Sequence, residues 1–123
     1  MTQQISAFAN RRLEAAELRV LRAALLEQLL FRRQQLRDIA WGANDIAGTA
    51  GARDTAAHSE VRHKLTVAAQ TALAETEAAL TRMDTGRYGG CGRCGRTISL
   101  QCLSVYPQAR YCTRCQHFLA ARQ

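Results

Sequence analysis

Four cysteines near the C-terminal end of the chain constrain its fold more than any other feature. They form two Cys-x-x-Cys pairs, separated by 17 residues, at Cys91, Cys94, Cys112 and Cys115. Each pair turns two thiolates toward one point, and the second pair completes a tetrahedral four-sulfur shell around one metal ion. Because protein sulfur fills all four positions, no place is left for a catalytic water. The spacing therefore predicts one structural Zn²⁺ and a function that lies elsewhere in the chain.

The start of the chain bears on the compartment in which the cysteines work. Residues Met1 to Arg12 contain no apolar stretch like the core of a signal peptide, and no segment has the length and hydrophobicity of a membrane span. We therefore expect a cytoplasmic protein that does not associate with a membrane. In such a reducing compartment, clustered cysteines hold metal more often than they form disulfides. Paired disulfides and a redox-active dithiol are the alternatives.

The charge of the chain is distributed unevenly. Its formal net charge is +7, which four thiolates and one zinc ion reduce to about +5. The segment from Thr85 to Gln123 contains no acidic residue and six arginines, at Arg87, Arg93, Arg96, Arg110, Arg114 and Arg122. Such a basic segment suits a polyanion or an acidic protein surface. Solubility and partial neutralisation of the thiolates explain the same charge equally well.

The first part of the chain has the pattern of a long amphipathic helix. From about Ser6 to Trp41 it contains no glycine or proline. Apolar residues recur at intervals of three, four or seven, at Leu18, Leu25, Leu29, Leu36, Ile39 and Ile46. Three further leucines widen this apolar face: Leu21, Leu26 and Leu30. Arg22 and Arg32 fall on the same stripe, so the seam with a partner helix is imperfect.

A turn and a second helix follow. Residues 42–54 mix glycine with Asn and Asp, a composition typical of turns. We expect Trp41, beside this turn, to pack across the end of the hairpin; contact with a partner is the alternative. The helical pattern resumes from about Asp54 to Asp84 and stops at Thr85-Gly86, where glycine favours the left-handed conformation that ends helices.

Two helices of matched length joined by a short turn bury their apolar stripes by running antiparallel. At about 1.5 Å per residue, each is about 45 to 55 Å long. The predicted fold is therefore mainly α. A long antiparallel helical hairpin, or coiled coil, occupies residues 1–85 with its tip at about 42–56. A four-cysteine zinc-finger head over residues 86–123 ends in a short helix from Gln116 to Arg122.

The residues around the first cysteine pair carry a family likeness. They read Gly86-Arg87-Tyr88-Gly89-Gly90-Cys91-Gly92-Arg93-Cys94-Gly95-Arg96-Thr97-Ile98, followed by Leu103 and Pro107. This segment resembles the DksA/TraR family of zinc-finger transcription regulators, and the likeness continues back along the preceding helix toward Leu65. GATA-type DNA-binding fingers share the cysteine spacing. They differ in lacking the aromatic-glycine lead-in, the apolar finger residues and the long hairpin.

The resemblance implies a bacterial transcription regulator that is not an enzyme. Members of the family bind RNA polymerase rather than promoter DNA, and they insert the hairpin through the secondary channel, where its tip alters promoter-complex stability. The resemblance therefore makes RNA polymerase the expected partner of a monomeric chain, without direct sequence-specific DNA binding. The basic head then contacts the acidic rim of the channel, with Arg93, Arg96 and Arg114 as candidate contacts.

The resemblance also points to an effector motif at the tip. The family carries an Asp-x-Ala signature there, which Asp54-Thr55-Ala56 matches in this chain. Asp54 has a second reading as a simple cap of the following helix, because its side-chain oxygen accepts hydrogen bonds from free backbone amides. Many members have another acidic residue three positions earlier, where this chain has Gly51.

Well-studied members bind the alarmone ppGpp at the polymerase interface through basic side chains. Counted from the zinc cysteines, the corresponding positions in this chain are Ala68, Glu75 and Gln116. None of these residues is cationic, whereas a polyphosphate ligand requires positive charge. We therefore expect weak or absent ppGpp dependence through this surface.

The remaining candidates favour no other chemistry. Cys102 is the odd thiol and is expected to be an ordinary residue of the finger loop, since a redox role requires a lowered thiol pKa. His117 is not expected to be a metal ligand, because four cysteines already fill the shell. The sequence has no phosphate-binding glycine loop and no nucleophile with a local base. Two other functions stay open: a nucleic-acid-binding protein with an arginine-rich head, and a structural coiled-coil protein that dimerises through the hairpin.

Overall fold

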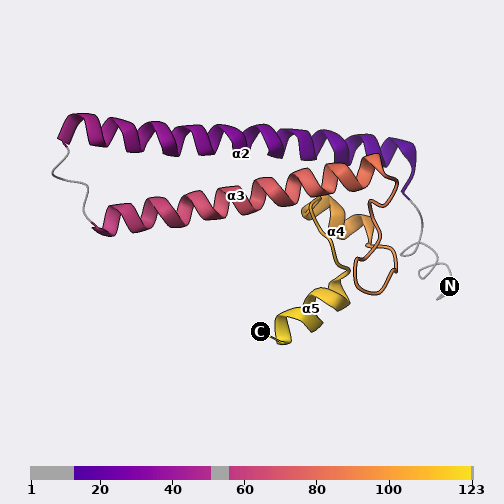
Figure 1. Ribbon diagram of the computed structural model, residues 1–123. Helices are drawn as coiled ribbons and strands as arrows, with labels where there is room; N and C mark the ends of the chain where they lie inside the picture. Colours follow the sequence, from indigo (N-terminus) through magenta and orange to yellow (C-terminus); the bar gives the residue numbers. More distant parts are fainter. Residues whose placement is uncertain (1–12, 51–55, 123) are drawn as a thin grey trace. The chain divides into compact units, whose positions relative to one another are not determined.

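The computed structural model describes residues 13–50 and 56–122. Its elements are the helices α2 (Ala15–Ala50), α3 (Ala56–Asp84), α4 (Leu100–Val105) and α5 (Thr113–Ala121), shown in Figure 1. The predicted fold class, a long helical hairpin followed by a small four-cysteine segment with a short C-terminal helix, is confirmed. Among the described residues no helix is both long and apolar enough to cross a membrane.

The chain divides into two compact units, and the division cuts through both long helices. The finger unit contains residues 1–26 and 78–123, and the hairpin unit contains residues 27–77. The finger therefore shares a unit with the first part of α2 and the last part of α3. Within each unit, the α2 and α3 segments lie side by side and run in opposite directions (Figure 1).

The start of α2 is set by a side-chain cap. The backbone N–H of Glu14 donates to the carboxylate of Glu17 at 2.9 Å, which satisfies an amide that has no partner within the helix. The expected start near Ser6 lies outside the described residues, but Leu13 and Glu14 are not helical. The helix therefore begins at Ala15.

The other end of α2 lies beyond the predicted turn. The helix continues through Gly42 and Gly48 to Ala50, so the turn predicted over residues 42–54 is wrong for its first nine positions. A glycine inside a helix costs only about 1 kcal/mol relative to alanine. Good helix formers between the glycines, among them Ala43 and Ala47, let the helix continue.

The end of α3 agrees with the prediction. Gly86 has φ +73°, and its N–H donates to the carbonyl of Met83 at 3.2 Å while the N–H of Arg87 donates to the carbonyl of Arg82 at 2.8 Å. This pair of hydrogen bonds is the Schellman motif, in which a left-handed glycine satisfies carbonyls at the helix end. It turns the chain out of α3 and into the finger.

The inner face of α3 is built from small side chains. Ala69 and Thr76 in the hairpin unit, and Ala79 in the finger unit, are buried with at most 1% exposure. The Thr76 hydroxyl donates to the carbonyl of Ala72 at 2.8 Å, which satisfies its polar group within the helix. Small residues allow the backbones of neighbouring helices to approach closely, but they bury little apolar area.

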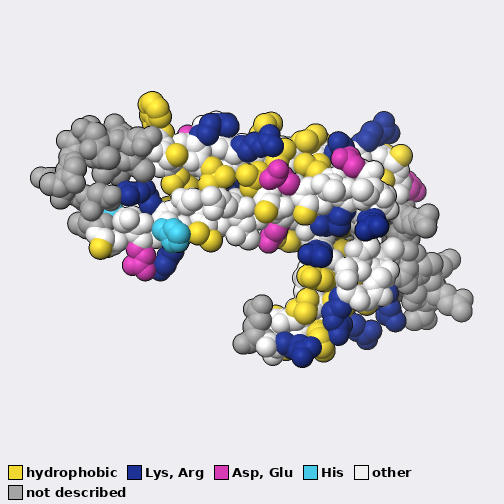
Figure 2. All heavy atoms as spheres, viewed as in Figure 1, with side chains coloured by type: hydrophobic (Ala, Val, Ile, Leu, Met, Phe, Trp, Pro, Cys, Tyr) yellow, Lys and Arg dark blue, Asp and Glu magenta, His cyan; other side chains and the backbone are white. Residues whose placement is uncertain are grey.

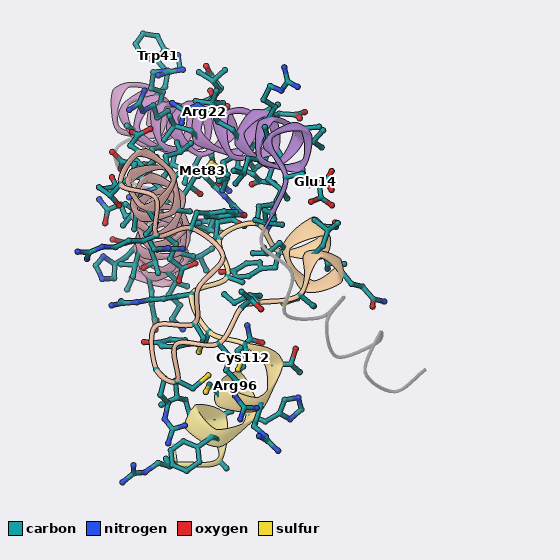
Figure 3. The ribbon with its side chains drawn as sticks, turned by 90° about the vertical axis from the view of Figure 1, so that its right-hand side faces the viewer. Glu14, Arg22, Trp41, Met83, Arg96 and Cys112 are labelled. Carbon is teal, nitrogen blue, oxygen red and sulfur yellow. The ribbon has the colours of Figure 1, made fainter. Side chains whose placement is uncertain are left out.

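The apolar face of α2 is narrower than the sequence predicts. Leu21 and Leu25 are buried, but Leu26 and Leu30 are 41% and 64% exposed. The expectation that Trp41 packs across the end of the hairpin is also wrong, since its side chain is 76% exposed and points away from α3 (Figure 3). A two-helix arrangement buries one stripe of each helix, so these neighbours of the stripe face solvent.

The two arginines on the α2 stripe behave differently. Arg22 is exposed and forms an ion pair with Asp84 of α3 at 2.9 Å, within the finger unit. Arg32 lies in the hairpin unit, where its Nε is buried without a hydrogen-bond partner among the described residues. Its terminal nitrogen donates to Gln35 at 3.0 Å. The imperfect seam expected at Arg32 is therefore present.

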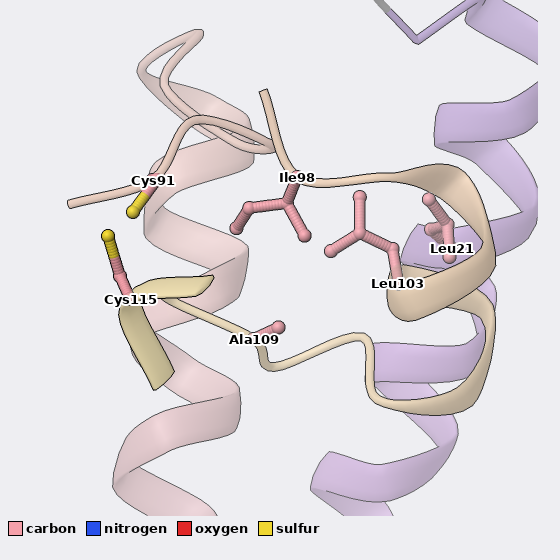
Figure 4. Close-up of a cluster of buried hydrophobic side chains, with 6 residues drawn as sticks. All are labelled: Leu21, Cys91, Ile98, Leu103, Ala109 and Cys115. Atoms are coloured by element: carbon pink, nitrogen blue, oxygen red, sulfur yellow. The ribbon is translucent and has the colours of Figure 1, made fainter. Parts of the chain in front are cut away.

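A hydrophobic cluster joins the finger to α2 inside the finger unit. It contains Leu21, Cys91, Ile98, Leu103, Ala109 and Cys115, drawn in Figure 4. Leu21 comes from α2 and Leu103 from α4, whereas two of the members are cysteines of the predicted metal shell. Residues near the metal site and near the helix base are thus members of one core.

We expect Leu25→Ala to lower the free energy of unfolding by about 2 to 5 kcal/mol, because the truncation leaves a cavity in a fully buried position. Its side chain has 0% exposure. The neighbouring Leu26→Ala is the matched control and should cost less than about 1 kcal/mol. Urea denaturation of the metal-loaded protein, followed by circular dichroism, measures both; equal losses would contradict the burial pattern.

Candidate metal centre

The first cysteine pair sits in a tight turn stabilised by backbone hydrogen bonds. The N–H of Cys91 donates to Arg96 at 2.7 Å, the N–H of Gly95 to Cys91 at 3.0 Å and the N–H of Ile98 to Gly89 at 2.7 Å. Gly89 and Gly95 have φ values of +89° and +77°, which favour glycine. At Gly89 there is also little space, because an added Cβ would lie 3.2 Å from the Leu13 side chain.

The second pair lies where the chain enters α5. Cys112 is the N-cap residue of this helix and Cys115 lies in its first turn. The N–H of Gln116 donates to the carbonyl of Cys112 at 2.9 Å, and the N–H of Gly92 donates to Arg110 at 2.9 Å. The last bond links the two cysteine-bearing segments directly.

The four sulfur atoms form one cluster. The Sγ atoms of Cys91, Cys94, Cys112 and Cys115 all lie within 4.8 Å of one another, and those of Cys94 and Cys112 are 3.8 Å apart. A tetrahedral zinc site with Zn–S bonds of about 2.3 Å places its sulfurs about 3.8 Å apart. The cluster therefore fits a tetrahedral thiophilic metal ion, and none of the five cysteines, all within the described chain, forms a disulfide.

Local hydrogen bonds prepare one sulfur to bind metal. Burial acts to raise the pKa of Cys91, but donation from the backbone N–H groups of Cys94, Cys112 and Arg93 lowers this pKa to about 6. A metal-bound sulfur must be a thiolate, so these amides stabilise the form that binds. The amides of Arg93 and Cys94 belong to the first cysteine turn, whereas that of Cys112 comes from the N-cap of α5.

The protonation state of Cys115 depends on the other three thiols of the cluster. The Arg93 guanidinium, with Nη1 3.5 Å from the Cys115 sulfur, acts to lower the pKa of Cys115. Burial and hydrogen bonding with the other three thiols outweigh it and raise this pKa to about 11 in the absence of metal. A divalent cation reverses this effect because it neutralises the crowded thiolates. The metal-free cluster therefore holds protons that metal binding must displace.

Cys102 and His117 lie outside the sulfur cluster. Cys102 belongs to α4 and packs, half-buried, against the hydrophobic core. His117 is exposed on α5. The helix α4 was not predicted: the Ser99 hydroxyl caps it by accepting from the N–H of Cys102 at 3.1 Å. The only sequence signal for α4 was that single capping serine before a six-residue helix.

The three candidate partner contacts on the finger line one cleft. Arg93, Arg96 and Arg114 surround a cavity of about 620 Å³ next to the sulfur cluster, and Figure 3 shows Arg96 beside Cys112. Arg93 also makes a contact within the finger, since its guanidinium carbon lies 3.8 Å from the centre of the Phe118 ring. This cation–π contact holds α5 against the first cysteine turn.

The visible face of the finger carries basic side chains, all of them arginine, without Asp or Glu (Figure 2). This distribution agrees with the absence of acidic residues after Asp84 in the sequence. The predicted tip motif is described only at its last residue. Ala56 is exposed at the start of α3, whereas Asp54, Thr55 and the neighbouring Gly51 lie outside the described residues.

A search of solved structures finds the same architecture in a known protein. The structure of transcription factor DksA2 from Pseudomonas aeruginosa matches with a TM-score of 0.77, covering 99% of this chain and 98% of that chain. The chain has the DksA fold. Sequence identity with DksA2 is 22%, so this DksA likeness establishes the arrangement of the backbone. No model of a known protein family matches the sequence, and no curated protein does either.

We expect Cys115→Ser to abolish tight metal binding and to unfold the finger, because one sulfur of a closed shell is lost and metal binding is coupled to folding. Cys102→Ser is the matched control, since it removes a thiol outside the cluster. Metal content by mass spectrometry and tertiary structure by NMR measure the two effects. A full metal complement in Cys115→Ser would contradict the assignment.

The same metal should be released by acid. Because the pKa of the Cys91 thiol is about 6, acidification below that pH protonates this ligand and favours dissociation. Metal affinity should therefore fall steeply between pH 7 and pH 5. Competition with a coloured metal indicator measures it.

Proposed function

We propose that this chain is a cytoplasmic transcription regulator that is not an enzyme. It binds RNA polymerase as a monomer and inserts its helical hairpin into the secondary channel, where it modulates promoter-complex stability. The observation that carries the proposal is the DksA fold over nearly the whole length of both chains, combined with the four-sulfur cluster. The metal is one structural Zn²⁺, because four thiolates in tetrahedral arrangement are its usual ligands.

The lengths of the helices support this mode of action. At about 1.5 Å per residue, the 36 residues of α2 and the 29 residues of α3 form helices of about 54 and 44 Å. Helices of this length reach into a deep channel while the finger stays outside. In the sequence, the proposed effector, Asp54-Thr55-Ala56, ends at the first residue of α3.

The finger supplies the proposed anchoring surface. Arg93, Arg96 and Arg114 are exposed and surround one cleft. Guanidinium groups bind carboxylates through paired hydrogen bonds, which suits an acidic rim on the polymerase. Because Arg93 also contacts Cys115 and Phe118, Arg96 and Arg114 are the better positions at which to test binding.

We expect the double charge reversal Arg96→Glu/Arg114→Glu to weaken polymerase binding about tenfold or more at low salt, with a smaller effect at high salt because salt screens exposed charges. Arg19→Glu/Arg87→Glu, at exposed positions of the finger unit outside this cleft, is the matched control for net charge. Pull-down of purified core polymerase by zinc-loaded protein measures binding.

Failure of the unaltered protein to retain polymerase would refute the proposal. Retention of DNA instead, falling steeply with salt, would favour the second candidate, a sequence-tolerant nucleic-acid binder. That candidate rests on the same arginine-lined cleft and on the lack of acidic residues after Asp84.

At the tip, we expect Asp54→Asn to leave polymerase binding unchanged and to reduce the effect on transcription from a sensitive promoter, because the substitution removes one charge from the effector and preserves its size.

We also expect the unaltered protein to act on transcription equally with and without ppGpp. Ala68 and Glu75 are exposed and not cationic, and the amide of Gln116 donates to Tyr111. Reconstituted transcription measures both, and strong ppGpp synergy would contradict the second expectation.

A further inference from the structure

A second cleft lies in the finger unit, apart from the arginines that the proposed function uses. Its volume is about 920 Å³, within the range of small-molecule sites in proteins. Its described lining comes from the start of α2, the last turns of α3, the turn that follows α3, and Arg110. All of these segments belong to the finger unit.

Glycines keep this cleft open. Gly86, Gly89, Gly90 and Gly92 all line it, so backbone forms much of its wall where side chains would otherwise fill the space. At Gly90 an added Cβ would meet only the Arg87 carbonyl, at 3.6 Å, and φ is not positive there. A Cβ is therefore tolerated at Gly90, and because this residue lines the cleft, we expect a larger side chain there to enter it.

Three arginines give the cleft its charge. Arg82 is in the last turn of α3, Arg87 follows the Gly86 turn, and Arg110 precedes the second cysteine pair; all three line the cleft. No acidic residue is among the described lining residues. Neither Arg87 nor Arg110 has a carboxylate partner within the described part of the chain.

The environment of Arg82 shows the electrostatic consequence. Burial, and then the charge of Arg110, lower the pKa of the Arg82 guanidinium. Its Nη2 donates to the carbonyls of Gln108 and Ala109 at 3.3 and 3.5 Å, which are weak contacts at the limit of hydrogen bonding. Among the described lining residues, only the metal-bound thiolate of Cys91 carries negative charge, so the three guanidinium groups leave the cleft positively charged.

Another part of the lining is apolar. Leu13, Leu18 and Ile98 contribute aliphatic surface, and the ring of Tyr88 contributes an aromatic one. The Tyr88 hydroxyl donates to the carbonyl of Pro107 at 2.8 Å, and burial raises its pKa to about 12, so this side chain stays neutral and fixed. The cleft thus offers guanidinium donors beside an apolar wall.

We propose that this cleft binds a small organic phosphate, whose oxyanion is held by Arg82, Arg87 and Arg110 and whose apolar body lies against Leu13, Leu18 and Tyr88. Guanidinium forks bind phosphate oxygens in pairs, and the apolar wall selects phosphate esters over the inorganic ion. The site is distinct from the Arg93, Arg96 and Arg114 cleft. Binding of the organic phosphate at this site does not require polymerase.

The test is an NMR titration of zinc-loaded, ¹⁵N-labelled protein with phenyl phosphate and, separately, inorganic phosphate at constant ionic strength. We expect saturable shifts of the amides of Gly86, Gly89, Gly90 and Gly92. Phenyl phosphate should bind about fivefold or more tightly than inorganic phosphate, because its ring buries apolar surface. No polymerase is present, so the result stands or falls separately from the proposed function.

Two variants and one control locate the site. Arg87→Gln/Arg110→Gln should weaken binding of phenyl phosphate about tenfold or more through loss of charge-assisted hydrogen bonds. Gly90→Phe should block the cleft while zinc content stays unchanged. Arg19→Gln/Arg33→Gln removes the same charge from exposed positions on α2 and should change the affinity by less than about twofold.

Several results would overturn the proposal. Shifts that rise linearly without saturation, or equal weakening in the two arginine pairs, would mean that the anion responds only to net charge. Shifts confined to residues 93–96 and 112–115 would place the anion at the other cleft. Undiminished binding in a folded, zinc-loaded Gly90→Phe protein would exclude this cavity.

Discussion

The convergence of four thiolates on one point determines the structure of the finger. Cys91 and Cys115 are members of both the sulfur cluster and the hydrophobic core, so metal binding and apolar burial order the same residues. The intervening chain must leave the first turn and return to α5. It does so through α4, whose Leu103 is fully buried. Without a metal ion, burial and the neighbouring thiols keep Cys115 protonated, so metal binding must displace a proton from this core position.

The shared core also explains why the finger and the start of α2 form one unit. Leu21 of α2 belongs to the cluster that contains both cysteines, and Arg22 pairs with Asp84 at the end of α3. The glycine turn at Gly86 directs the chain from α3 into this core. Positive charge then gathers in two clefts of the finger unit, because the sequence supplies arginines after Asp84 and no carboxylates.

Sequence reasoning succeeded where a feature depends on local spacing. The sulfur cluster follows from two Cys-x-x-Cys pairs, and the end of α3 follows from one glycine that favours a left-handed conformation. It failed where tertiary context decides. Gly42 was read as a breaker, although a single glycine is a small cost within a long helix. Leu26 and Leu30 were expected to widen the apolar face and Trp41 to pack across the end of the hairpin, but a two-helix arrangement has room for only one stripe.

The second cleft had no sequence signal at all. Arg82, Arg87 and Arg110 are separated along the chain and approach one cavity only after α3, the Gly86 turn and the second cysteine segment have folded. The glycines that keep it open were explained locally, as turn formers before Cys91. Their second effect, the removal of side chains from a cavity wall, requires the three-dimensional arrangement.

The small residues on the inner face of α3 have a thermodynamic consequence for the hairpin unit. Among its described side chains only Ala69 and Thr76 are buried, and the Nε of Arg32 is desolvated without a partner. Little apolar area is therefore removed from water in this unit. We expect its local unfolding to require less free energy than that of the finger, where a bound metal ion would add stability. The hairpin unit is thus expected to be the less stable of the two units. Leu30, Phe31 and Trp41 of this unit are exposed. In the proposed function, a protein surface that covered them would supply the missing burial, so that ordering of the helices and binding would be one event.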